Sequence, residues 1–342
     1  MIKIKLKEVS LQDLKKIVIE FDWVPVAEIL KRNSDSRGKK SMFKAVNCLR
    51  AFILGAHLEI EDDTELARRI AQQKEYQEFC GASKSPSHDV LTKFRNNYRY
   101  KIEKVFYYLD DLLESLGAFE DDSLSFDGTD IPVPIKNKVS PHRYHFGAKS
   151  DNKKFHGFWL MIATSVKHQI ARSFEVGYAR TGQIELCKSL LSYRRIDDSK
   201  DNFYFFLDGI FDCEEIYNLV LEKQGKLPII AYNKRCSSYD TIKDLPKDDW
   251  RFIYNPLLHF PSFISLIYKQ RDSSERLNGH AKMYTLISRI ANKVKKSHTI
   301  RKNTVEHIVT FTFILEQLKL LTLYKDKLRQ KTLCDFIYND TN

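Results

Sequence analysis

The segment Ser123-Leu-Ser-Phe-Asp-Gly-Thr-Asp-Ile-Pro-Val133 marks the point at which the character of the chain changes from helical to strand-forming. Its alternation of apolar and polar residues, together with the residues that bound it, predicts a strand. A fully apolar run from Phe203 to Leu207 predicts another strand, which ends at Asp208. If these two strands are neighbours at the centre of a sheet, the carboxylates of Asp127 and Asp208 come close together.

The residues between and after these strands predict the rest of a sheet and its helices. In chain order, the further elements are strands at 155–166 and 170–178, a helix at 183–194, a helix at 212–223 and a strand at 227–232. The first two of these strands are separated by Lys167-His168-Gln169, which predicts a hairpin. Three meandering strands followed by strands separated by helices indicate an α/β fold, in which helices cover both faces of a mixed sheet.

The first third of the chain predicts helices only, because its apolar residues recur at helical spacing. The predicted helices cover residues 10–33, 42–58, 65–73 and, as two helices, 88–117; two more are expected near the C-terminus, at 273–294 and 304–328. We therefore predict an all-helical N-terminal domain at 1–118 for DNA binding or oligomerisation, a catalytic domain at 119–328 and a tail at 329–342.

The charge of the chain favours a polyanionic partner. There are 56 Lys and Arg against 45 Asp and Glu, a formal charge of +11. Between residues 269 and 302 there are ten basic residues and two acids. Nucleic acid is the first expectation and an anionic membrane the second, while an ordinary basic protein without such a partner is the alternative.

Cysteine usage and apolar runs indicate the compartment. The six cysteines form no C-x-x-C pair, which favours reduced thiols and gives no sign of a zinc site. The first residues lack the apolar core of a signal peptide, and the longest apolar stretch, around Phe158 to Thr164, is too short to span a bilayer. We expect a cytoplasmic protein associated with the nucleoid. Walker and dinucleotide-binding motifs are also missing.

The run 268–282 carries a set of residues suited to phosphate chemistry. Tyr268, Arg271, Glu275 and Lys282 are offset by −7, −4, 0 and +7 from the glutamate, which keeps them close to one face of a helix. A carboxylate between cations and a phenol can hold a metal ion against a phosphate. Three converging carboxylates are enough to bind Mg²⁺ or Mn²⁺ for phosphodiester chemistry.

Each carboxylate also has an ordinary structural explanation. The Asp127-Gly-Thr-Asp130 sequence is typical of a turn, and Asp130 competes with Asp127 as a ligand. Asp208 can cap the helix that follows, although Asp212 is better placed for that role. Asp272-Ser-Ser-Glu275 fits a helix-capping sequence. Basic residues such as Arg271 and Lys282 often belong to a solvated helix face.

The spacing Tyr-x2-Arg-x3-Glu-x6-Lys, which the run 268–282 fits without a gap, resembles the signature of one group of DDE transposases of bacterial insertion sequences. Asp127 in Asp-Gly-Thr resembles the first aspartate of that family, and Asp208 at the end of an apolar strand resembles the second. Family members often have Asp-x-Gly-Tyr or Asp-x-Gly-Phe there, whereas this chain has Asp208-Gly-Ile-Phe211. The helical segment Phe43 to Arg95 is similar to the family's N-terminal domain.

This resemblance implies a ribonuclease H-like catalytic domain that cleaves the ends of a transposon and joins them to target DNA. It assigns Asp127, Asp208 and Glu275 as catalytic residues and ligands of Mg²⁺, for which Mn²⁺ substitutes. Arg271 and Lys282 hold the DNA, with Tyr268 assisting. It also implies a homo-oligomer that binds double-stranded DNA at terminal inverted repeats.

Two other functions are compatible with the same residues. One is a catalytically silent or domesticated DNA-binding relative, although the presence of all three acids argues against decay. The other is a metal-dependent DNA nuclease without strand transfer, which only the family resemblance separates from a transposase.

Overall fold

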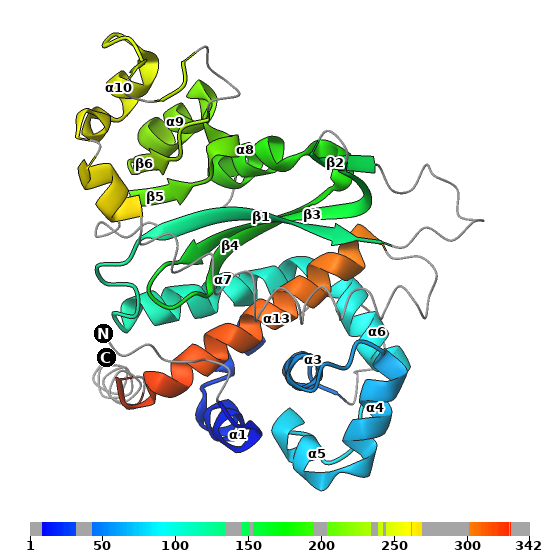
Figure 1. Ribbon diagram of the computed structural model, residues 1–342. Helices are drawn as coiled ribbons and strands as arrows, with labels where there is room; N and C mark the ends of the chain where they lie inside the picture. The colour runs from blue at the N-terminus through cyan, green and yellow to red at the C-terminus, as the bar shows by residue number, and fades with distance from the viewer. Residues whose placement is uncertain are drawn as a thin grey trace. The chain divides into compact units, whose positions relative to one another are not determined.

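The computed structural model describes residues 9–31, 43–133, 146–150, 153–193, 204–233, 239–241, 244–260, 262–268, 301–327 and 329 (Figure 1). The chain divides into two compact units. Unit 1 comprises Met1–Ala118 with Asn303–Asn342, and unit 2 comprises Phe119–Lys302. No helix in the described part of the chain is both long enough and apolar enough to cross a membrane.

Unit 1 is built from helices. They are α1 (Leu11–Glu20), α2 (Val24–Ile29), α3 (Ala45–His57), α4 (Asp63–Gln72), α5 (Lys74–Cys80), α6 (His88–Asn97), α7 (Arg99–Ser115) and α13 (Lys302–Leu323). The sequence predicted one helix over 10–33, which is wrong, because Phe21 is extended and ends α1. Pro25 then lies in the first turn of α2, where its missing N–H costs nothing.

The C-terminal helix α13 belongs to unit 1. The sequence analysis placed residues 304–328 in the second domain, whereas the structure groups them with the N-terminal helices. Two ring contacts show why: Phe311 of α13 stacks on Phe52 of α3 with ring centroids 4.6 Å apart, and Phe313 packs near Phe106 of α7. Both are contacts between residues more than 200 positions apart, which local sequence patterns do not encode.

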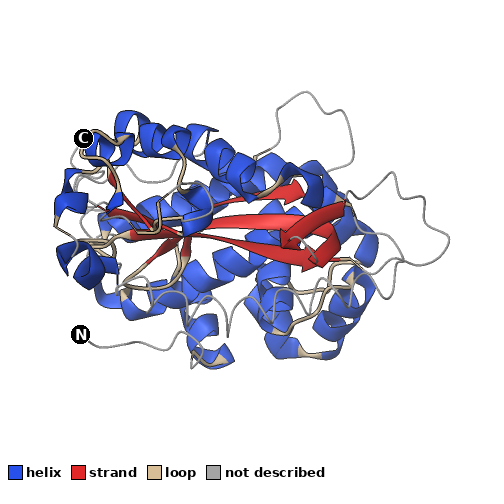
Figure 2. Cartoon of the chain, turned by 45° about the horizontal axis from the view of Figure 1, so that its top comes forward, coloured by secondary structure: helices blue, strands red, loops and turns tan. Residues whose placement is uncertain are grey.

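Unit 2 contains one mixed sheet, shown in red in Figure 2. Its strands are β1 (Leu124–Pro132), β2 (Phe146–Ser150), β3 (Lys153–Ser165), β4 (Ala171–Tyr178), β5 (Tyr204–Leu207) and β6 (Leu227–Ile230). The order is β2-β3-β1-β5-β6, with β4 also beside β3. β3 is antiparallel to its neighbours, while β1, β5 and β6 run parallel. The expected mixed α/β sheet is confirmed; β2 is an addition that the sequence analysis did not predict.

Helical segments cover both faces of this sheet. One face carries α8 (Gln183–Tyr193) and α9 (Glu214–Asn218), whose Leu190 and Ile216 are fully buried in the same cluster as Phe126 and Leu207. The other face packs Phe206 and Ile229 against Ile267, which lies in the helical segment 262–268. The helix predicted at 273–294 lies outside the described residues.

Gly157 allows β1 and β3 to pair. It has a φ of 153°, and a Cβ placed on it would lie 2.1 Å from the carbonyl oxygen of Ile131. It pairs with Pro132, at the end of β1. Any side chain here must therefore push apart the two strands that carry the centre of the sheet.

Gly157→Ala is expected to lower the free energy of unfolding by about 2–5 kcal/mol, because backbone strain and a steric clash add together. Urea unfolding of the full-length chain measures it. Gly225→Ala is the matched control: φ is also positive there, at 62°, but nothing lies within 4 Å of the added Cβ. That control should lose only about 1–2 kcal/mol, and equal losses in the two variants would contradict the steric explanation.

Candidate functional site

The pairing of β1 with β5 brings Asp127 and Asp208 together. The two strands are parallel, and their last paired residues are Phe126 and Leu207. Asp127 and Asp208 are the next residue on each strand, so the same register sets them side by side. Neighbouring strands lie about 4.8 Å apart. Asp127 therefore lies within β1 opposite Asp208, which directly follows the carboxyl end of β5.

Both carboxylates belong to the same face of the sheet. Side chains alternate between faces along a strand, and Phe126 and Leu207 lie together in the core cluster beneath α8 and α9. Asp127 and Asp208 consequently share the opposite face with Phe206. Asp130, three positions beyond Asp127, falls on the α8 side instead. The alternation thus distinguishes between the two aspartates that the sequence left in competition.

Local contacts hold this pair in place. Asp127 is half-buried, whereas Asp208 is exposed. Oδ1 of Asp208 accepts a 2.7 Å hydrogen bond from the backbone N–H of Gly209, at the start of a short 3-10 turn, η3 (Gly209–Phe211). This bond restricts rotation of the carboxylate. Gly128 packs close to α8, since a Cβ there would lie 2.6 Å from Oε1 at the flexible end of the Gln183 side chain.

Tyr268 lies at the same site. Its hydroxyl donates a 3.2 Å hydrogen bond to the carbonyl oxygen of Leu207, the residue that immediately precedes Asp208. Its ring packs with Phe206, Ile229 and Ile267 on the face that carries the two carboxylates. The beginning of the run 268–282 is therefore attached beside the aspartate pair.

Arg271, Glu275 and Lys282 lie outside the described residues, so the structure gives no position for them. Within the residues that are described, no three His, Cys, Asp or Glu side chains form a metal-binding group. The aspartate pair alone supplies carboxylate oxygens, which are the ligands that Mg²⁺ and Mn²⁺ prefer. The donor chemistry fits a divalent metal.

A buried ion pair supports the chain just after Asp208. Nε of Arg251, in α10 (Trp250–Tyr254), donates to both carboxylate oxygens of Asp212, at 2.9 and 3.2 Å. Asp212 also accepts a 3.0 Å bond from the N–H of Asn233. Both side chains of the ion pair are almost completely buried. The suggestion that Asp212 caps a helix is therefore wrong: α9 has Cys213 as its N-cap residue, with no side-chain cap bond.

Arg251 is a residue that the sequence analysis missed. Burial alone would lower the pKa of its guanidinium, but the bond to Asp212 and the nearby charge of Asp249 hold that pKa above its usual value. The guanidinium also lies 4.4 Å from the ring centroid of Trp250, which in turn packs on Tyr217 of α9. Nothing local in the sequence links positions 212 and 251, which are 39 residues apart.

The N-terminal segment is similar in sequence to one known domain family. A family model described as a transposase domain, DUF772, matches residues 3–97, a segment that includes α1 to α6 of unit 1. Comparisons with curated proteins and with solved structures found no match. The matched segment points to transposases as the class of protein, and it ends before the aspartate pair.

Arg251→Met is expected to destabilise the protein by about 3–5 kcal/mol, because it leaves Asp212 as a buried, unpaired charge. Urea unfolding measures the change. Lys188→Met is the control, since Lys188 pairs with the exposed Glu185 at 3.1 Å and such pairs contribute at most about 1 kcal/mol. The double variant Arg251→Met/Asp212→Leu should recover much of the loss, and a failure to recover would argue against charge burial as the cause.

Proposed function

We propose that this protein is a DNA transposase of the DDE type, which cleaves the ends of an insertion sequence and joins them to target DNA. The observation that carries the proposal is the register of β1 and β5, which sets Asp127 beside Asp208 on one face of the sheet. The transposase-domain match at residues 3–97 supports the same class of protein from a separate part of the chain.

The strand arrangement supports a ribonuclease H-like catalytic domain. Three strands, β1, β3 and β4, form an antiparallel meander, and β5 and β6 extend the sheet in parallel from β1. The expected fold likewise had three meandering strands followed by strands separated by helices. The two aspartates then lie on adjacent strands of this sheet, as the resemblance requires of its first and second acids.

Asp127 and Asp208 would hold the catalytic Mg²⁺ or Mn²⁺ with Glu275 as the third carboxylate. Glu275 follows Tyr268 by seven positions, and Tyr268 is hydrogen-bonded beside Asp208. When bound, such metal ions activate the attacking water or 3′-hydroxyl and stabilise the departing oxygen. The N–H of Gly209 orients the Asp208 carboxylate for this role.

The DNA contacts complete the proposal. Arg271 and Lys282 would bind phosphates beside the carboxylates, Arg271 in a bidentate manner and Lys282 as a point charge. The hydroxyl of Tyr268 is used in the contact with Leu207, so we assign Tyr268 the role of positioning this segment as well as assisting with DNA. The double-stranded terminal repeats would be paired by a homo-oligomer.

Asp127→Asn and Asp208→Asn are each expected to lower the rate of DNA cleavage at least about a hundredfold, because loss of a metal ligand removes several kcal/mol of transition-state stabilisation. The assay uses DNA that carries the flanking element ends, with Mg²⁺, with Mn²⁺ and with EDTA. Binding to the same DNA should survive in both variants.

Asp130→Asn is the matched control for this experiment. It makes the same chemical change three residues away, on the opposite face of β1, and should leave cleavage within about threefold of the original rate. If Asp130→Asn abolished cleavage while Asp127→Asn retained it, the assignment of the ligands would be wrong. Binding without cleavage in every metal would favour the catalytically silent relative.

Lys282→Ala is expected to weaken DNA binding and to lower the slope of log K against log salt by about 1, because one phosphate contact is lost. Titration of labelled element-end DNA at several salt concentrations measures this slope. Glu275→Gln should leave the slope unchanged and remove cleavage. An unchanged slope in Lys282→Ala would exclude that lysine as a phosphate contact.

A further inference from the structure

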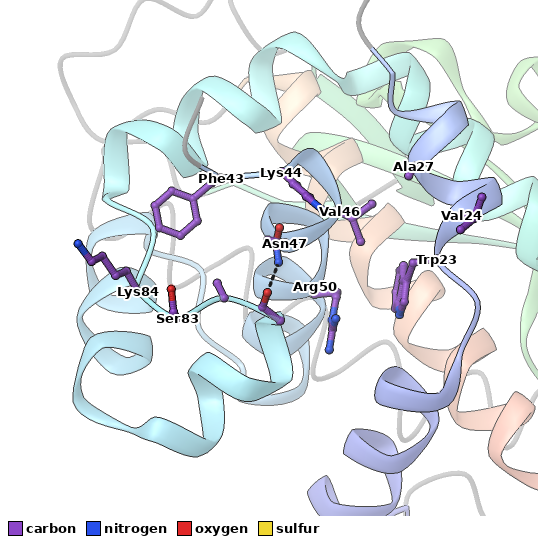
Figure 3. A pocket seen from close by; sticks show the side chains of 12 residues that line it. Trp23, Val24, Ala27, Phe43, Lys44, Val46, Asn47, Arg50, Ser83 and Lys84 are labelled. Carbon is purple, nitrogen blue, oxygen red and sulfur yellow. Dashed lines mark hydrogen bonds between the residues drawn. The ribbon is translucent and has the colours of Figure 1, made fainter. Parts of the chain in front are cut away.

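Unit 1 contains a pocket of about 580 Å³ between α2, the start of α3 and the segment after α5 (Figure 3). The match to a transposase domain covers these elements but assigns no binding residue among them. Twelve residues line the pocket, among them Trp23, Lys44, Asn47, Arg50, Gly81 and Lys84. Three are cations and none is an acid. The pocket is therefore positively charged and partly aromatic.

Arg50 is the buried cation of this pocket, and its hydrogen bonding is incomplete. Only 9% of the residue is exposed, and its Nε is buried without a hydrogen-bond partner among the described residues. One further nitrogen lies 3.5 Å from the carbonyl oxygen of Glu78, which is long for a hydrogen bond. Burial lowers the pKa of this guanidinium, yet arginine keeps its charge in proteins. A bound anion would pair with the charge of this buried guanidinium.

The surroundings hold Arg50 in position. Asn47, one turn before it on α3, donates from Nδ2 to the carbonyl oxygens of Cys80 and Gly81, at 2.8 and 2.7 Å. Gly81 has a φ of 66°, and a Cβ on it would lie 2.5 Å from a guanidinium nitrogen of Arg50. The end of α5 is therefore shaped to admit the guanidinium. Arg50 also complements the carbonyls at the end of α5, a structural role that needs no ligand.

That structural role of Arg50 does not explain the aromatic residue and the two lysines that also line the pocket. Trp23 lies with its ring centroid 5.5 Å from Cζ of Arg50, and its Nε1 donates a 2.7 Å bond to the carbonyl oxygen of Val18, which fixes the ring. Lys44 and Lys84, both exposed, lie on the rim. Neither lysine is needed for the structural role described for Arg50, which is to complement the carbonyl groups at the end of α5. A fixed indole beside three cations is the combination that binds single-stranded nucleic acid, through stacking and phosphate contacts.

We infer that this pocket binds one unpaired nucleotide of DNA, with its phosphate at Arg50, its base or sugar against Trp23, and the adjacent phosphates of the strand at Lys44 and Lys84 on the rim. The volume lies within the range of pockets that hold small molecules, so a single nucleotide fits and a duplex does not enter. The inference rests on the proposed function for the identity of the ligand as DNA. It adds a contact to an end or a distorted step of the element DNA.

The test uses the full-length chain with a fluorescein-labelled 12-nucleotide single strand and the matching duplex. Lys44→Ala and Lys84→Ala should each weaken single-strand binding about fivefold or more, and each should lower the salt slope by about 0.7. Lys16→Ala is the control, because Lys16 is an equally charged, exposed residue of α1 that does not line the pocket. It should change affinity by less than twofold. Equal effects in all three variants would overturn the inference, since they would reflect net charge alone.

Trp23→Phe provides the second measurement, because DNA stacked on Trp23 quenches tryptophan emission. The quench by the single strand should shrink in this variant, while Trp159 and Trp250, both in unit 2, continue to emit. An unchanged quench, or an equal loss of affinity for the duplex, would overturn the assignment to an unpaired nucleotide. Inorganic phosphate is a separate arm: if phosphate changes the emission of Trp23 while the single strand does not bind, the pocket takes a free phosphate and the inference fails.

Failure of the inference and failure of the proposed function give different results. If the pocket variants bind DNA normally while cleavage still depends on Asp127, the transposase proposal stands without the pocket. If no metal supports cleavage but Lys44→Ala and Lys84→Ala lose single-strand binding, the pocket stands without the catalysis. Arg50→Gln can be added where thermal unfolding shows that it folds, and it should show the largest loss of binding.

Discussion

The parallel pairing of β1 with β5 is the constraint on which the rest of the candidate site depends. It fixes the register in which Phe126 lies opposite Leu207, and that register alone places Asp127 beside Asp208. A shift of one residue would send one carboxylate to the other face of the sheet. The buried apolar residues on both strands oppose such a shift, since Phe126, Phe205 and Leu207 are fully buried under α8 and α9. The hydrophobic core therefore determines the position of the charges.

The two faces of the sheet carry different sets of residues. Beneath α8 and α9, the face is a closed apolar cluster that stabilises the register. The opposite face has a smaller cluster around Phe206 and Ile229, with the two carboxylates at its edge. Tyr268 packs on that cluster and also binds the backbone next to Asp208. The larger apolar cluster and the two candidate carboxylates thus lie on different faces, and Tyr268 is the described residue that links the smaller cluster to the run containing Glu275.

Sequence patterns predicted those features that depend on local periodicity. The strands β1, β3, β4, β5 and β6 and the helix α8 lie close to their predicted ranges, because each combines an apolar pattern with clear turn residues at its ends. Sequence patterns did not predict the features that depend on contacts between residues far apart in the chain. Ion pairing of Arg251 with Asp212 and the grouping of α13 with the N-terminal helices depend on contacts between distant positions. The break at Phe21 was a local feature, but the amphipathic pattern continued across it.

The candidate site was partly predictable for the same reason. That Asp127 and Asp208 end or interrupt apolar strands is visible in the sequence, whereas their shared face follows from a register that only the three-dimensional pairing defines. The pocket in unit 1 was not predictable at all, since Trp23, Arg50 and Lys84 come from three segments with no common pattern. The burial of Arg50 is the clearest physical sign of this pocket. The Nε atom of Arg50 is buried without a hydrogen-bond partner among the described residues, and burial of a charged group costs free energy that a phosphate in the pocket would offset.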